Sequence, residues 1–117
     1  MPNISQERRE VMRLIVEPPK RLTQDRAQTC YDIECGNGPK ILRIARRVCT
    51  LHNAWADMNN ISNRQRKILD NRLVQASMSV KTLLECHHNK IQIGCNIKRV
   101  EDLQSKITDR LLTIRNR

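Results

Sequence analysis

The chain has 117 residues, and its 22 Lys and Arg exceed its 12 Asp and Glu, which gives a net charge of +10. With no Phe, one Trp and one Tyr, it has few side chains that stack on unpaired bases, which disfavours a reader of single strands. The polar N-terminus and the short apolar runs predict neither a secretory signal peptide nor a membrane-spanning helix, and the length predicts a single domain over residues 1–117.

The first predicted helix follows Ser5, a suitable N-cap residue, and ends at Pro18-Pro19. Its apolar side chains recur at helical spacing: Val11, Met12, Leu14 and Ile15. Residues 20–38 are then expected to form an irregular connection, because Gly36-Asn37-Gly38 is a strong turn signal.

The second predicted helix runs from Pro39, which suits a first helical position, to about Met58. One side of this helix is apolar and carries Ile41, Ile44, Ala45, Val48, Leu51 and Trp55. Because Trp55 lies on that side, we expect a buried anchor rather than a platform for a base. Another side is basic, and no acidic residue lies between Glu34 and Asp57.

The third predicted helix begins after Ser62, which forms a capping box with Gln65, and runs to about His88. Its apolar residues alternate at intervals of four and three, and His87 continues the stripe formed by Leu69, Leu73, Ala76, Val80 and Leu83. Val74 and Met78 lie off this stripe. A helix that is apolar on more than one side is usually central or contacts another subunit.

The last predicted helix follows the break at Gly94-Cys95-Asn96 and carries a similar apolar stripe, formed by Val100, Leu103, Ile107, Leu111 and Ile114. Ile91 and Ile93 alternate with polar neighbours, and we assign them to the preceding loop. The sequence therefore predicts an all-α fold, a small helical bundle of about four helices with a long central third helix.

Basic side chains recur about once per turn on the last three predicted helices. Arg43 and Arg47 are like charges one turn apart, an arrangement that destabilises a helix unless an anion sits between them. These charges could simply keep the surface solvated. Excess positive charge spread over several helices, however, favours a polyanion as binding partner. The candidate phosphate-binding residues are Lys40, Arg43, Arg46, Arg47, Arg64, Lys67, Lys81, Arg99, Lys106 and Arg110.

Helix faces rich in Arg and Lys contact phosphates without reading bases. Duplex or structured RNA is therefore the partner we expect first, because duplex RNA is recognised by shape and backbone, and DNA is the second expectation. RNA-silencing suppressors and accessory RNA-binding proteins of RNA viruses are the biological class that we expect, by analogy of type alone.

The alternative is a non-catalytic protein-interaction module. In that case the stripe from Leu69 to Leu83, or the patch formed by Val74 and Met78, docks a partner helix, and the charge steers it toward an acidic surface. We also expect a homo-oligomer that forms through apolar helix faces. The scarcity of aromatic residues argues against a membrane-surface protein.

Cys and His residues offer a second group of candidates. Five irregularly spaced Cys favour reduced thiols, so we expect an intracellular protein of the cytoplasm or nucleus, not a secreted one. Cys49 and His52 lie one helical turn apart, and zinc, if bound, would be held by Cys86, His88 and Cys95. No Cys pair has the spacing of a strong zinc site, and no catalytic motif is present, so we expect no metal, no cofactor and no enzymatic activity.

Overall fold

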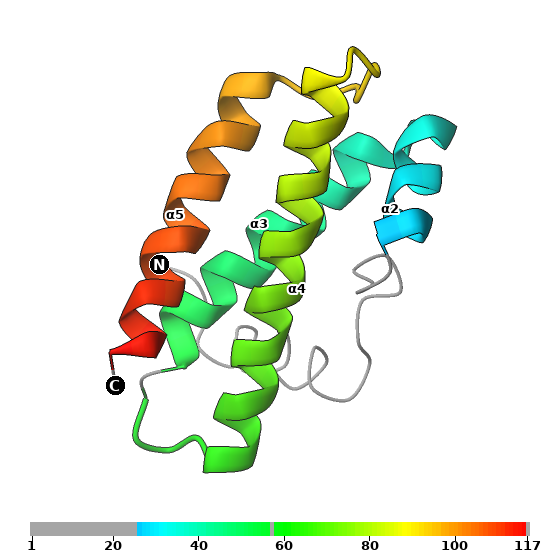
Figure 1. Ribbon diagram of the computed structural model, residues 1–117. Coiled ribbons are helices and arrows are strands. Elements are labelled where there is room, and N and C mark those ends of the chain that lie inside the picture. Colours follow the sequence, from blue (N-terminus) through cyan, green and yellow to red (C-terminus); the bar gives the residue numbers. More distant parts are fainter. Residues whose placement is uncertain (1–25, 57, 117) are drawn as a thin grey trace.

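A computed structural model describes residues 26–56 and 58–116. Figure 1 shows this part, which is helical and contains no strand among the described residues, in the order α2 (Arg26–Asp32), a π-type turn (Ile33–Asn37), α3 (Gly38–Trp55), α4 (Asn63–His88) and α5 (Ile97–Arg115). The all-α prediction is confirmed for these residues. The first predicted helix, after Ser5, lies outside them. Within the same ranges, no helix combines the length and the apolar character that crossing a membrane requires.

The long helix α4 is the centre of the arrangement. It packs against α2, α3 and α5, and Figure 1 shows it in front of α3 with α5 beside it. The predicted capping box begins this helix: Ser62 Oγ accepts a hydrogen bond from the Gln65 N–H, and Gln65 Oε1 accepts one from the Ser62 N–H, at 3.2 and 3.1 Å. The long helix predicted from Ser62 to about His88 is present and central among the described helices, whereas the predicted count of about four helices is not confirmed.

Most members of the predicted apolar stripes of the last three helices meet in one core, and Leu51, Trp55 and Leu69 belong to a second, smaller cluster. Leu73, Ala76, Val80 and Leu83 of α4 are fully buried between α3 and α5, and Leu69 is nearly so. Burying an aliphatic side chain of this size contributes roughly 1.5–3 kcal/mol, so this contact stabilises the three helices together. The stripe does not continue at His87, which is exposed; its last member is the buried Cys86.

The prediction of an irregular connection over residues 20–38 is wrong for the described part, residues 26–38. This part is helical, because α2 packs on α4 and buries Thr29, Asp32 and Ile33, which local turn signals do not report. The turn signal does locate a bend: Gly36 has a φ of +87°, a left-handed conformation that favours glycine. The backbone of Gly38, by contrast, is helical.

Helix α3 ends at Trp55, before the predicted end at Met58. The guanidinium group of Arg66 on α4 binds the chain just after this end. Its Nε donates to the carbonyl oxygen of Ala56 at 2.6 Å, and its Nη2 donates to that of Met58 at 3.1 Å. Carbonyls that a continuing helix would use are thus bonded to a side chain of the next helix.

The loop between α4 and α5 brings the beginnings of α3 and α5 together. Gly38 at the start of α3 lies so close to the carbonyl oxygen of Ile93 that a Cβ atom at this position would collide with it. Ile91 and Ile93 belong to this loop, as predicted, and Ile93 is buried in the core. This close approach fixes where the N-terminal turns of the two helices face each other.

Candidate nucleic-acid interface

A groove runs between α3 and α5, on the side of the bundle away from the exposed face of α4. It consists of two adjoining hollows of about 570 and 330 Å³, and Arg46 and Arg99 line both. These volumes fall within the range of ordinary ligand sites. The described residues that line the groove also include Pro39, Leu42, Arg43, Cys49, Thr50, Asn53, Gly94, Cys95, Asn96, Asp102, Leu103 and Lys106.

The two walls of the groove follow from helical spacing. On α3, polar residues at intervals of three and four form one wall: Arg43, Arg46, Thr50 and Asn53. On α5, Arg99 and Lys106 lie two turns apart and form the other wall. Buried side chains of Leu42, Cys49 and Leu103 form the floor. Cations from two helices therefore face one shared space.

Positive potential extends to the floor of this groove. Burial raises the pKa of the Cys49 thiol, whereas the positive charges of Lys106 and Arg110 act in the opposite direction. Asp102 contributes the one carboxylate among the described lining residues. The arrangement attracts anions along most of its length, with a weaker stretch near Asp102.

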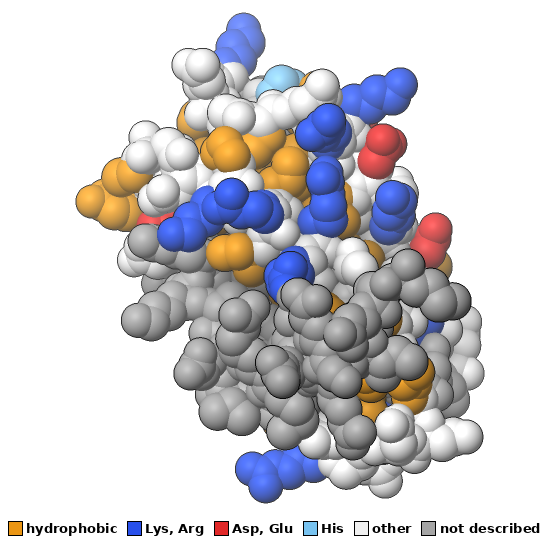
Figure 2. All heavy atoms as spheres, turned by 180° about the vertical axis from the view of Figure 1, so that it is seen from behind, with side chains coloured by type: hydrophobic (Ala, Val, Ile, Leu, Met, Phe, Trp, Pro, Cys, Tyr) orange, Lys and Arg blue, Asp and Glu red, His pale blue; other side chains and the backbone are white. Residues whose placement is uncertain are grey.

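Figure 2 views the molecule from the side of α3 and α5. Lys and Arg side chains gather over its upper half, around exposed apolar side chains, and few acidic side chains interrupt them. The groove residues Arg43, Arg46, Arg99 and Lys106 belong to the candidates predicted from the sequence, and the fold brings these four together.

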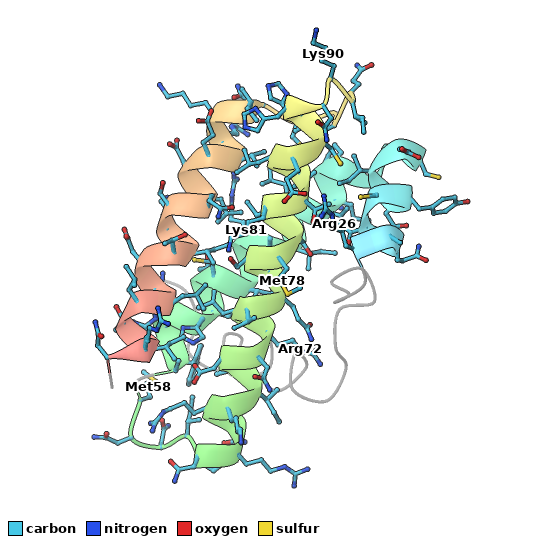
Figure 3. The ribbon with its side chains drawn as sticks, viewed as in Figure 1. Arg26, Met58, Arg72, Met78, Lys81 and Lys90 are labelled. Atoms are coloured by element: carbon cyan, nitrogen blue, oxygen red, sulfur yellow. The ribbon has the colours of Figure 1, made fainter. Side chains whose placement is uncertain are left out.

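The remaining candidates lie elsewhere. Lys40 and Arg47 are exposed on α3 but are outside the lining of the groove, Arg64 and Lys67 are exposed near the start of α4, and Lys81 is exposed further along α4. Lys81 is labelled on α4 in Figure 3 and is not among the described residues that line the groove. The structure therefore divides the predicted set into a convergent group and scattered surface charges.

Arg110 forms a hydrogen bond with a buried side chain, so only part of its guanidinium group is available at the surface. Its Nε donates a hydrogen bond to Nδ1 of the fully buried His52 at 2.9 Å, and Nε2 of His52 lies 2.7 Å from Oδ1 of Asp70. Since Nδ1 accepts, Nε2 must carry the proton that it donates to the carboxylate, which assigns the neutral imidazole. The network joins α3, α4 and α5.

Neither this network nor two polar residues of the groove, Thr50 and Asn53, were predicted from the sequence. His52 continues the buried series of α3 at the same intervals, after Ile41, Ala45 and Val48, so its position was a signal for burial. Thr50 and Asn53 carry no charge, and only their places one and two turns from Arg46 associate them with the groove.

The Cys and His candidates do not form a metal site in the described ranges. Both ring nitrogens of His52 are engaged by Arg110 and Asp70, so neither is available to pair with Cys49. His87 and His88 are exposed, Cys86 is buried, and Cys95 donates to the carbonyl oxygen of Ile93. Across residues 26–56 and 58–116, no three His, Cys, Asp or Glu side chains gather as metal ligands would.

The two aromatic residues do not offer a platform in the groove. Trp55 is buried, as expected, and packs with Leu51, Ala56 and Leu69. Tyr31 is exposed on α2 and is not among the described residues that line the groove. Base stacking is therefore not a property of this site.

No protein-family model, curated protein or solved structure matches this chain.

Proposed function

We propose that this protein is a non-catalytic nucleic-acid-binding protein whose groove between α3 and α5 binds the phosphate backbone of duplex or structured RNA. The observation that carries the proposal is the convergence of Arg43 and Arg46 with Arg99 and Lys106 across one groove. Like charges repel one another when nothing lies between them, and a phosphate backbone stabilises such an arrangement.

Two features of the groove favour a backbone over bases. Its described lining contains no aromatic side chain, so bases would find no stacking surface there. Arg and Lys together with hydroxyl and amide side chains are the usual partners of phosphate and sugar oxygens.

RNA is favoured over DNA because Thr50 and Asn53 border the same groove as the cations. A hydroxyl and an amide can exchange hydrogen bonds with a ribose 2′-OH, the group that distinguishes RNA from DNA at a binding site. The expected class remains an accessory RNA-binding protein of the type found in RNA viruses, by analogy alone.

The alternative function, a protein-interaction module, had two candidate docking surfaces, and one of them is buried. The stripe from Leu69 to Leu83 is buried against α3 and α5 in the folded chain and cannot dock a partner helix. Only the patch formed by Val74 and Met78 remains exposed.

The test compares binding of labelled duplex RNA, single-stranded RNA and duplex DNA over a salt series. We expect the wild-type protein to prefer duplex RNA. The variant Arg43→Gln/Arg46→Gln/Arg99→Gln/Lys106→Gln should lose at least about tenfold in affinity and show a shallower dependence on salt, because each lost phosphate contact removes nearly one unit of slope for a B-form duplex. We expect the same direction for RNA.

A matched control separates the groove from net charge. The variant Arg64→Gln/Lys90→Gln/Lys98→Gln/Arg115→Gln removes the same charge from exposed positions that are outside the groove lining. It should retain most of the affinity. Equal losses in the two variants, or no binding by the wild type at about 50 mM salt, would contradict the proposal, since electrostatic binding is then near its strongest.

A further inference from the structure

The outward face of α4 carries a stripe of exposed residues that no described helix covers. We call it the outer stripe, and its members are Lys67, Asn71, Val74, Met78, Lys81 and Glu85. Val74 is 43% exposed and Met78 is 41% exposed, although both are large apolar side chains. Figure 3 shows Met78 and Lys81 on the side of α4 that faces away from α3.

The outer stripe is complementary to itself when reversed. Its residues are spaced symmetrically about a point between Val74 and Met78. If a second α4 is laid antiparallel across the first, Val74 meets Met78 and Asn71 meets Lys81. At both ends Lys67 then faces Glu85. Such pairing of one patch with itself about a two-fold axis is the usual form of a homodimer interface.

The two charged residues at the ends are available for this contact. Arg26 of α2 forms an ion pair with Oε2 of Glu85, and Oε1 of Glu85 has no partner among the described residues. A carboxylate accepts several hydrogen bonds, so Glu85 can bind Arg26 and a second cation together. Lys67 is exposed and has no ion-pair partner within the same part of the chain.

We propose that the outer stripe is a dimer interface in which a second copy of this chain binds with its α4 antiparallel to the first. A parallel arrangement would place Lys67 against Lys67 and Glu85 against Glu85, which is repulsive at both ends. The apolar centre is small, so we expect the dimer to be in equilibrium with the monomer. The proposal does not depend on nucleic-acid binding.

Net charge opposes this association, because each copy carries +10. At about 0.15 M salt the screening length is roughly 8 Å, so long-range repulsion is largely removed while contacts at close range persist. The test is therefore made at that ionic strength, without nucleic acid.

The experiment is sedimentation equilibrium of the full chain across a concentration series. We expect a monomer–dimer equilibrium. Each charge reversal, Lys67→Glu or Glu85→Lys, should weaken the dimer at least about tenfold, because it replaces attraction with repulsion at both ends. The double variant Lys67→Glu/Glu85→Lys should restore it. An equimolar mixture of the two single variants should also associate, because every end then pairs an acid with a base.

Two controls accompany these variants. Val74→Ser/Met78→Ser should abolish the dimer, whereas Leu112→Ser, at a similarly exposed apolar position on α5, should leave it intact. Circular dichroism and urea unfolding should show that every variant is folded. A wild-type chain that stays monomeric at all concentrations would overturn the proposal. So would single reversals without effect, or a mixture that fails to associate.

Discussion

Lys90 is the described non-glycine residue with a left-handed backbone, at φ +64°. It follows the C-cap residue of α4 in a Schellman motif: the Ile91 N–H donates to the carbonyl of Cys86 at 2.9 Å, and the Lys90 N–H donates to that of His87 at 3.0 Å. Glycine is usual at this position because a Cβ atom is disfavoured in the left-handed region.

The variant Lys90→Gly should therefore stabilise the fold by about 0.5–1 kcal/mol. This figure is the backbone strain that the substitution relieves, minus the larger conformational entropy that glycine loses on folding. Urea unfolding monitored by circular dichroism measures this free energy. The neighbouring variant Asn89→Gly is the control, because Asn89 has a negative φ and the substitution relieves no strain. The two substitutions should change the free energy of unfolding in opposite directions. Equal destabilisation by both would contradict the strain at Lys90.

At the scale of the elements, the sequence predicts α3, α4 and α5 well. Each has a strong apolar periodicity over many residues, and α4 also has a capping box between Ser62 and Gln65. It does not predict α2, whose few buried residues depend on packing against α4. Local signals located the bend at Gly36 but not the helical conformation around it, because that conformation is stabilised by tertiary contacts.

The candidate site is predicted less completely for a similar reason. Composition and spacing identify Arg43, Arg46, Arg99 and Lys106 as basic surface residues, along with others that the fold leaves scattered. Which cations converge depends on how α3 and α5 are placed side by side. Arg110 illustrates the limit, because its place on α5 indicates a basic face, yet its Nε is bonded to a histidine of α3.

The network of His52, Asp70 and Arg110 gives a prediction about how the helices are joined. Asp70→Ala leaves the buried Nε2–H without its acceptor and should cost roughly 1–3 kcal/mol of unfolding free energy. In a double-mutant cycle with His52→Leu, the two costs should fall short of additivity by about 1 kcal/mol or more.

Nitrogen NMR shifts of the His52 ring provide a direct check, because the hydrogen bonds require the proton on Nε2. Strictly additive free energies, or a proton on Nδ1, would show that the three side chains do not act together.

At the scale of the whole molecule, burial of thiols makes the stability sensitive to alkaline pH. Burial raises the pKa of Cys49, Cys86 and Cys95. Above the usual thiol pKa of about 8.5, the unfolded chain releases protons that the folded chain retains, so stability is complete below that pH and falls as the pH rises toward the folded values.

Unfolding by urea at about pH 7.5 and pH 9.5, under reducing conditions, tests this expectation. The wild type should be less stable at the higher pH, and Cys49→Ala/Cys86→Ala/Cys95→Ala should narrow the difference even if it lowers both values. Ser105→Ala, at an exposed position without a titratable group, should leave the difference unchanged. If the triple variant retains the full difference in stability between the two pH values, that difference comes from other titrating groups and the expectation is wrong.

The close approach of Gly38 to Ile93 has a kinetic consequence. The contact joins segments far apart in the chain, with the whole of α4 between them, so it forms only after a large loop has closed. Contacts of this kind are typically made late, after α3 and α4 have paired, and their loss accelerates unfolding more than it slows folding. We therefore expect the meeting of the two helix starts, and with it the part of the groove near Gly94 and Asn96, to be already broken in the transition state for unfolding.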